Sequence, residues 1–301
     1  MVEMALDAQW RPASSLFTSS ARGDRPVISV VGVPTFATSL TPRSDRSAAV
    51  AIRAALDRYS TYMYSLGADL ADLVEFAELG DLDNPDGTDV IERLGRVLKD
   101  AALPVVILGG DNAATHHALR ALAGENLGEW ALITFDAHLD VRDGVSNGSP
   151  VRQLVEAGLA GENLTQIGLA DFSNSGPYAA RVAGYGATVV PRSALRGRSM
   201  SEVVAEACDR VSPDGRPIYV DLDMDVADRS VVPGCPAAAP GGLSADELRE
   251  ISRACGRDPR VAAIDVTEID PARDEQDERT VRLAALCLLE FAAGVTERTN
   301  S

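Results

Sequence analysis

The sequence alternates short, continuous apolar runs with longer segments of helical periodicity. A strand that is apolar along its whole length has to be buried on both faces, which is typical of a parallel sheet covered by helices. The pattern therefore predicts an α/β fold with a mostly parallel central sheet. The apolar runs are residues 27–34, 104–108, 129–135, 164–169, 187–190, 217–222 and 261–266, and the helical segments are 47–62, 89–102, 115–123, 149–157, 177–183, 201–211, 244–256 and 277–293.

The length of 301 residues allows one large domain or two smaller ones. No internal repeat and no low-complexity linker interrupts the alternation of strands and helices. The Gly- and Pro-rich stretch 232–242 lies between a predicted strand and a predicted helix, so we interpret it as an active-site loop. We predict a single catalytic domain over 27–301, preceded by an N-terminal arm or tail over 1–26, which has no periodicity.

The charge balance restricts the partners of the chain. Lys+Arg number 28 and Asp+Glu number 45, so the net charge is −17. A binder of nucleic acid or of anionic lipid needs surplus cations, and we therefore expect neither partner. We also expect no membrane span and no secretory signal, because the chain has no run of about 18 apolar residues and its first residues include Glu3 and Asp7. Four widely spaced cysteines are typical of buried thiols in a cytoplasmic protein.

Four of the predicted strands are followed by side chains that can bind metal. These segments are Gly109-Gly-Asp-Asn112, Asp136-Ala-His-Leu-Asp140, Asp221-Leu-Asp-Met-Asp225 and Thr267-Glu-Ile-Asp270. In an open parallel sheet, ligands bind beyond the carboxyl ends of the strands. The four segments therefore predict one functional site at this edge of the sheet.

The spacing of the acids indicates a metal centre. Side chains at positions i, i+2 and i+4 of an extended segment point the same way, so Asp136, His138 and Asp140 converge. Asp221 and Asp223 converge likewise, and Asp225 is a further candidate for this group. Several carboxylates in one crevice repel one another unless cations are present. A set of oxygen ligands with one imidazole fits Mn²⁺ better than structural zinc. Two ions roughly 3.5–4 Å apart would activate a water molecule between them.

The ordered motifs resemble those of the ureohydrolase family, which includes arginases, agmatinases and formiminoglutamases. The motifs are GGDN at 109–112, FDAHLD at 135–140, NGSPVRQL at 147–154, QIG at 166–168, YVDLDMDVADRSVVPGCPAAAPGGLS at 219–244 and DVTEIDP at 265–271. The resemblance implies a three-layer α/β/α arginase-like fold, two Mn²⁺ ions and a homo-oligomer, either a trimer or a hexamer.

The resemblance also implies a role for each site residue. Asp136 and Asp221 would bridge the two ions, Asp140 and Asn112 would complete one metal site, and His138 and Asp223 would complete the other. Asp140 would also carry a proton to the leaving amine. Glu268 would pair with the planar, cationic amidinium of the substrate, whose parallel donors match a carboxylate.

Two motifs depart from the common family pattern. Residue 112 is Asn where the family usually has His, which predicts that one site is weakened or selects another divalent ion such as Ni²⁺. The Asn147-Gly-Ser-Pro150 loop replaces a His-containing segment of arginases and agmatinases, and resembles the loop of formiminoglutamases. The sequence is therefore most similar to the formimidoylglutamase branch, with a role in histidine metabolism.

This branch cleaves N-formimidoyl-L-glutamate to glutamate and formamide. A substrate with two carboxylates needs cationic or amide partners, so we predict that Asn147, Arg152 and Arg229 bind it. Three alternatives stay open: a guanidino-compound hydrolase that releases urea, a metal-poor pseudoenzyme or binding subunit, and a nucleotide-binding protein that uses Gly109 and Gly110. The last lacks a G-x-G-x-x-G motif.

Overall fold

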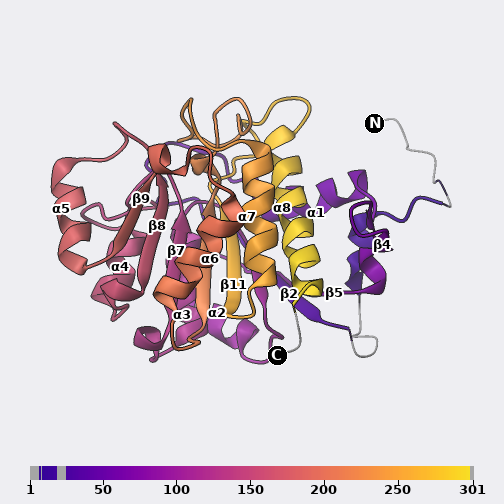
Figure 1. Cartoon of the computed structure of the whole chain (residues 1–301), viewed down its shortest axis with the longest axis horizontal. Helices are drawn as coiled ribbons and strands as arrows, with labels where there is room; N and C mark the ends of the chain where they lie inside the picture. The colour runs from indigo at the N-terminus through magenta and orange to yellow at the C-terminus, as the bar shows by residue number, and fades with distance from the viewer. Residues whose placement is uncertain (1–6, 8, 19–24, 299–301) are drawn as a thin grey trace.

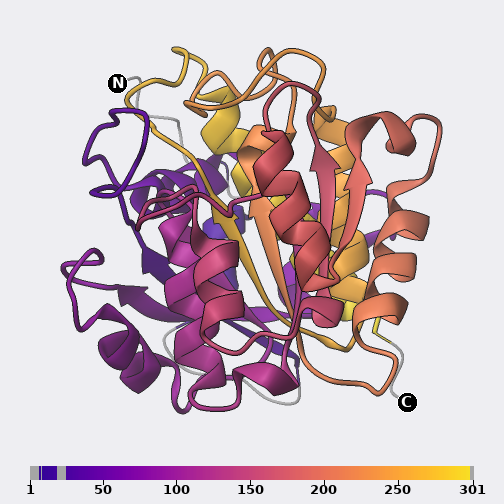
Figure 2. The same cartoon turned by 90° about the vertical axis from the view of Figure 1, so that its left-hand side faces the viewer.

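A single parallel sheet forms the centre of the chain. The computed structural model describes residues 7, 9–18 and 25–298, and within them nine strands are joined in the order β1-β5-β2-β6-β11-β10-β7-β8-β9. Helices cover both faces (Figures 1 and 2), which confirms the predicted three-layer α/β/α architecture. The strands are β1 (Phe17–Thr18), β2 (Val27–Val33), β5 (Glu75–Asp81), β6 (Val105–Gly109), β7 (Ala131–Phe135), β8 (Leu164–Leu169), β9 (Thr188–Pro191), β10 (Ile218–Asp223) and β11 (Val261–Thr267).

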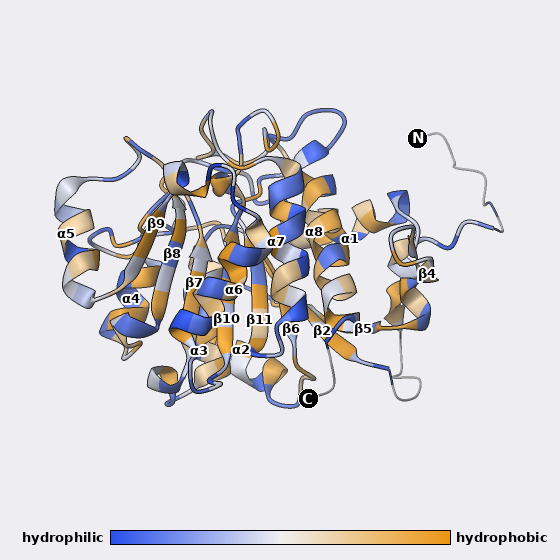
Figure 3. Ribbon diagram, viewed as in Figure 1, coloured by the Kyte–Doolittle hydropathy of each residue, from blue (hydrophilic) through white to orange (hydrophobic). Residues whose placement is uncertain are grey.

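Two apolar cores lie on opposite faces of the sheet. The first packs α1, α6, α7 and α8 against one face, and the second packs α2 to α5 against the other. Figure 3 shows the central strands as largely hydrophobic and the helices as mixed, as expected for elements that bury one stripe each. The helices are α1 (Ala48–Ala55), α2 (Val90–Leu98), α3 (Ala113–Ala123), α4 (Pro150–Glu156), α5 (Gly176–Tyr185), α6 (Met200–Val211), α7 (Ala245–Arg257) and α8 (Arg279–Thr296).

Local sequence signals fix several helix starts. Ser47 accepts a hydrogen bond from the backbone of Val50 at the start of α1, and Pro150 occupies the first turn of α4. Ser244 and Glu247 form a reciprocal capping box at the start of α7. No helix in the described part of the chain is both long and apolar enough to cross a bilayer.

The predicted helix over 47–62 ends early. α1 stops at Ala55, and a short hairpin of β3 (Tyr62–Met63) and β4 (Ala68–Asp69) follows. The backbone of Ala13 donates to Tyr59, and that of Thr61 donates to Arg11. Pairing with a distant segment therefore holds residues 59–61 extended, which overrides their local helical pattern.

The same contacts place the described part of the predicted N-terminal arm. Ala13 and Leu16 are buried, and β1 pairs in parallel with β5 at the edge of the sheet. The strand β5 was absent from the sequence prediction because its exposed half is polar, and Arg53 pairs there with Glu78 and Asp81. Residues 11–18 thus pack on the chain's own sheet, and the rest of 1–26, apart from residues 7, 9, 10, 25 and 26, lies outside the described residues.

Candidate metal centre and substrate cleft

The four motif-bearing strands are neighbours in the sheet. Their order is β6-β11-β10-β7 and every pairing among them is parallel, so their carboxyl ends meet at one edge. The loops that follow them gather at the top of Figure 1. Two backbone segments approach closely at this edge. A Cβ at Gly110 would lie 2.0 Å from the carbonyl oxygen of Thr35, so only glycine fits there. The structure thereby brings the predicted metal-capable residues together, and it buries them: Asn112, Asp136, Asp140, Asp221, Asp223 and Glu268 are each at most 8% exposed.

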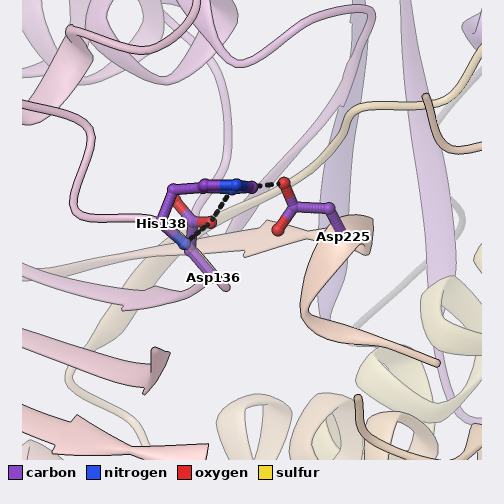
Figure 4. A group of neighbouring side chains, drawn as sticks. All are labelled: Asp136, His138 and Asp225. Carbon is purple, nitrogen blue, oxygen red and sulfur yellow. Dashed lines mark hydrogen bonds and ion pairs between the residues drawn. The ribbon is translucent and has the colours of Figure 1, made fainter. Parts of the chain in front are cut away.

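Asp136, His138 and Asp225 form the tightest cluster (Figure 4). One ligand atom from each lies within 4.8 Å of the others. His138 Nδ1 is 2.7 Å from Asp225 Oδ2 and 3.5 Å from Asp136 Oδ1. Asp221 and Asp223 lie on β10 and point the same way, as predicted. Asp136 and His138 come after the end of β7, and Asp225 lies in a 3-10 turn after β10. The turns that follow the strands, and not extended strand geometry, therefore bring this cluster together. Asp225, the third acid of its motif, is the one that contacts the imidazole.

Burial and mutual repulsion between the acids set the electrostatics of the centre. Burial, followed by repulsion from neighbouring carboxylates, raises the pKa of Asp136, Asp221 and Asp223 well above the usual range. Burial also raises the pKa of Asp140 to about 7. Burial alone would lower the pKa of His138, but Asp225 and further acids raise it to about 10. The centre therefore holds protons that a divalent cation would displace.

Unsatisfied oxygens mark the place where a cation fits. Asp136 Oδ2 and Asp221 Oδ2 are buried, and neither has a hydrogen-bond partner among the described residues. Buried polar atoms are normally paired, so these two carboxylate oxygens call for a ligand that accepts electron pairs. The donor set of carboxylates and one imidazole suits a divalent ion of the Mn²⁺ type. The residues present fit the predicted metal centre.

Asn112 already has partners on both sides of its amide. Its Nδ2 donates to Asp140 Oδ2 across 2.7 Å. Its Oδ1 accepts from Thr115 Oγ1 at 2.7 Å and from Thr267 Oγ1 at 3.1 Å. The structure therefore places Asn112 beside the predicted ligand Asp140, where it orients that carboxylate.

Two of the predicted catalytic residues have a strained backbone. Asp140 adopts φ 51° and Glu268 adopts φ 61°, a left-handed region that non-glycine residues rarely occupy. Such conformations persist where the surrounding structure determines them, and they concentrate at functional sites. Here each one turns a carboxylate at the end of a strand toward the same cleft.

The cleft is a hollow of about 190 Å³ above the acids. Glu268 lies on its wall, and Glu268 Oε1 accepts hydrogen bonds from the backbone of Asn112 at 2.9 Å and from Asn147 Nδ2 at 2.8 Å. Burial raises the pKa of Glu268 to about 7, although the charge of Arg43 opposes that rise. The lining residues are Leu40, Thr41, His138, Asp140, Arg142, Asn147, Gly148, Asp223, Asp225, Ala237 and Glu268.

The three predicted substrate-binding residues occupy different places. Asn147 lines the cleft and contacts Glu268. Arg152 instead braces the preceding loop, since its guanidinium donates to the carbonyls of Arg142 and Gly144 and pairs with Glu156. Arg229 donates to the carbonyl of Cys235 and so braces the loop over 229–239. The structure brings neither arginine into the lining of the cleft.

Two arginines near the cleft escaped the sequence prediction. Arg142 lines the cleft, and its guanidinium makes no hydrogen bond to any described residue. Its position directly after the D-x-H-x-D motif was a signal that could have found it. Arg43 is buried against Glu268, with Arg43 NH1 3.7 Å from Glu268 Oε2. It precedes α1 by several residues, far from every strand-end motif, and nothing in its sequence surroundings pointed to the site.

Comparison with known proteins agrees with this geometry. The family model described as the arginase family matches residues 27–294. The chain is 34% identical over 278 residues to a formimidoylglutamase of Halalkalibacterium halodurans, which covers 88% of this chain and 86% of the relative. It is also 34% identical over 279 residues to a formimidoylglutamase of Bacillus subtilis, with the same coverage.

Solved structures share the fold. The crystal structure of the Bacillus subtilis formimidoylglutamase has a TM-score of 0.88 at 32% identity and covers 99% of this chain and 96% of that one. A formiminoglutamase of Trypanosoma cruzi, solved with Mn²⁺, has a TM-score of 0.83 at 23% identity, covers 97% of this chain and all of that one, and supports the fold alone. These matches confirm the predicted family and fold class and agree with the prediction of a hydrolase that acts on C–N bonds. The chain belongs to the arginase family.

Proposed function

We propose that this chain is a two-metal hydrolase that converts N-formimidoyl-L-glutamate to L-glutamate and formamide. The observation that carries the proposal is the placement of Glu268 beside the acidic centre. Glu268 Oε1 is held by two donors, whereas Glu268 Oε2 accepts no hydrogen bond from the described residues. This oxygen lies 3.7 Å from Arg43 NH1 and is otherwise open to the cleft. A carboxylate beside metal-binding acids with one oxygen that accepts no hydrogen bond suits a planar cationic amidinium. The relatives at 34% identity that are named formimidoylglutamase support this substrate.

The proposed metal ligands follow the two strand-end motifs. Asp136 and Asp221 would hold both ions, Asp140 with Asn112 would complete one site, and His138 with Asp223 would complete the other. When bound, divalent ions there supply Lewis-acid activation of the attacking water. The preferred ion is Mn²⁺. The metal site on the Asn112 side would be the weaker one, or would take another ion such as Ni²⁺. An amide is a poorer ligand than imidazole, and the Asn112 side chain already has three hydrogen-bond partners.

The protein's own groups position the substrate and move the proton. Glu268 binds the amidinium and turns its carbon toward the acidic centre. Water adds to that carbon, the bond to the glutamate nitrogen breaks, and the amine leaves with an added proton. Asp140 would carry this proton, because its carboxyl group lines the cleft beside the acidic centre and a carboxylate there can take up a proton and release it to the leaving amine.

Arg142 is the proposed partner of a substrate carboxylate. It lines both the cleft above the acids and an adjoining hollow of about 340 Å³ that also contains Phe172 and Tyr178. A free guanidinium pairs well with a carboxylate. A cation at this end of the cleft favours a dicarboxylate and disfavours agmatine, whose far end is itself a cation.

A product assay tests the proposal. Protein reconstituted separately with Mn²⁺ and with Ni²⁺ is incubated with N-formimidoyl-L-glutamate and with a panel of guanidino compounds that includes agmatine, arginine and guanidinobutyrate. We expect formamide and L-glutamate from the first substrate and little urea from the panel. Urea as the main product would instead establish a guanidino-compound hydrolase. Fewer than one bound ion per chain after loading, together with no turnover, would establish a pseudoenzyme or binding subunit.

Assembly and location are further parts of the proposal. We propose a homo-oligomer, either a trimer or a hexamer, in the cytoplasm, and a role in histidine metabolism. The four cysteines are free and buried, which suits a reducing compartment. Sedimentation or light scattering gives the subunit number, and a purely monomeric protein at micromolar concentration would contradict this part.

A further inference from the structure

Arg43 is a buried cation whose hydrogen bonds are mostly unmade. Its side chain is 2% exposed, and among the described residues its Nε and NH1 have no hydrogen-bond partner. Its NH2 donates to the carbonyl of Ile269. A buried charge is strongly unfavourable unless it is paired, so the position of Arg43 needs an explanation in the charges around it.

The carboxylate best placed to pair with Arg43 is Glu268. Arg43 NH1 lies 3.7 Å from Glu268 Oε2. Two further acids on neighbouring segments have other partners: Asp270 accepts from the backbone and the hydroxyl of Ser44, and Asp86 accepts from the backbone of Phe36 and Ala37. Glu268 is therefore the acid whose second oxygen is open to the Arg43 guanidinium.

The segment that carries Arg43 also holds Glu268 from its other side. Within this segment, the backbone of Leu40 donates to Asn147 Oδ1 at 2.9 Å, and Asn147 Nδ2 donates to Glu268 Oε1 at 2.8 Å. Arg43 approaches the other oxygen. Residues 35–44, which we name the clamp segment, thus reach both oxygens of one carboxylate.

The clamp segment is itself fastened to the strand ends. Ser39 Oγ donates to Asp111 Oδ2 at 2.6 Å, and the backbone of Asp111 donates to the carbonyl of Thr35 at 2.8 Å. At the far end, Ser44 Oγ donates to Asp270 Oδ1 at 2.5 Å. These bonds tie the segment to the ends of β6 and β11, so the position of Arg43 is set by the same strands that carry Asn112 and Glu268.

We propose that Arg43 is a positioning residue, which fixes Glu268 Oε2 and balances the charge of the Glu268 carboxylate so that this group can bind the amidinium of the substrate. This inference rests on the proposed function of Glu268. The carbonyl of Ile269 holds the Arg43 guanidinium through NH2, so NH1 presents a positive charge at a fixed position 3.7 Å from Glu268 Oε2. Without Arg43, only the donors on Oε1 would hold the Glu268 carboxylate, and its negative charge would lie unbalanced among the neighbouring acids.

The test compares three variants as Mn²⁺-loaded full-length protein. Arg43→Met keeps most of the side-chain volume, and Arg43→Lys keeps the charge without the planar guanidinium. Arg46→Met is a matched control. Arg46 is exposed, lies three residues away in sequence and makes no ion pair with a described residue. For each variant we measure bound Mn²⁺, thermal stability, kcat and KM for N-formimidoyl-L-glutamate, and the inhibition constants of millimolar guanidinium chloride and of the product L-glutamate. Under the proposed function, Glu268 binds the guanidinium ion, whereas the binding of L-glutamate does not require Glu268.

We expect Arg43→Met to raise KM and the inhibition constant of guanidinium by about 10- to 100-fold, because the buried Glu268 carboxylate loses its charged neighbour. Bound Mn²⁺ and the inhibition constant of L-glutamate should change less than about twofold. Arg43→Lys should raise the same two constants by a smaller factor. This variant remains informative if Arg43→Met does not fold. Arg46→Met should match the parent enzyme.

The proposed role of Arg43 is overturned if Arg43→Met and Arg46→Met have the same KM and the same inhibition constant for guanidinium. It is also overturned if the two inhibitors weaken equally, or if Mn²⁺ is lost, because either result indicates a general structural role. Failure of the parent enzyme and of Arg46→Met to release formamide would refute the proposed function instead. The two failures are therefore distinguishable.

Discussion

The side-chain amide of Asn112 donates a 2.7 Å hydrogen bond to Asp140, which joins the residue that departs from the common family motif to a proposed ligand and proton carrier. The amide oxygen accepts from Thr115 and Thr267 at the same time. One asparagine thus satisfies three neighbours in a site where most groups are acidic. Both polar atoms of the Asn112 side chain thus have hydrogen-bond partners in the place where the family usually has histidine.

We expect Asn112→His to bind the second Mn²⁺ about tenfold more tightly, because imidazole is a better ligand than an amide for a borderline divalent ion. A calorimetric titration of the metal-free protein with Mn²⁺ gives the two dissociation constants. Asn126→His, at an exposed turn, controls for the added imidazole. Unchanged affinity in Asn112→His would show that residue 112 is not a ligand.

Asp136→Asn should abolish activity and yet stabilise the metal-free protein. Burial and the neighbouring acids raise the Asp136 pKa, so folding of the metal-free protein requires this carboxyl group to take up a proton. The amide of Asn has no such requirement. We expect kcat/KM to fall by more than about 1,000-fold and the Tm of the metal-free protein to rise by roughly 2 °C or more. Asp143→Asn, in an exposed loop, serves as the control. Retained turnover with two bound ions would remove Asp136 from the centre.

Stability of the metal-free protein should fall as the pH rises. In the unfolded chain, carboxyl groups ionise near pH 4, whereas burial holds the folded pKa of Asp140 and of Glu268 at about 7. Between these values the folded state binds more protons than the unfolded state, so the free energy of unfolding decreases with rising pH. His138, with a folded pKa of about 10, continues the same trend above its unfolded value.

Urea unfolding at several pH values from 5 to 8, after chelation and again with Mn²⁺, measures this effect. Added Mn²⁺ should stabilise the protein more at pH 8 than at pH 5, because the ions bind the ionised carboxylates. A metal-free stability that is flat or that rises over this range would contradict the assigned protonation states.

Arg142→Gln and Arg152→Gln should have different effects. Arg142 lines the cleft with a free guanidinium, so its loss should raise KM by about 10- to 100-fold and lower kcat far less. Arg152 braces the backbone of its own loop, so its loss should lower the Tm while KM changes little. Steady-state kinetics and a melting curve for each variant measure these effects. The reverse pattern would support the sequence-based prediction that Arg152 binds the substrate.

The sequence alone determined the parallel sheet and the place of its chemistry. Apolar runs such as residues 104–108 can only be buried on both faces, and the acids that follow them must then lie at one edge. The period of two also determined that Asp221 and Asp223, which lie on β10, point to the same side. These features are local, because strand geometry fixes where each side chain points.

The tertiary structure decided which residues meet across the chain. In the folded chain, Arg43 lies against Glu268. Arg142 lines the cleft and Arg152 does not. Residues 59–61 are extended because they pair with the N-terminal segment. Each outcome depends on a contact between segments far apart in sequence, such as residues 35–44 with the end of β11. No local pattern encodes such a contact, since the free energy that holds it comes from burial and pairing formed only when the sheet is assembled.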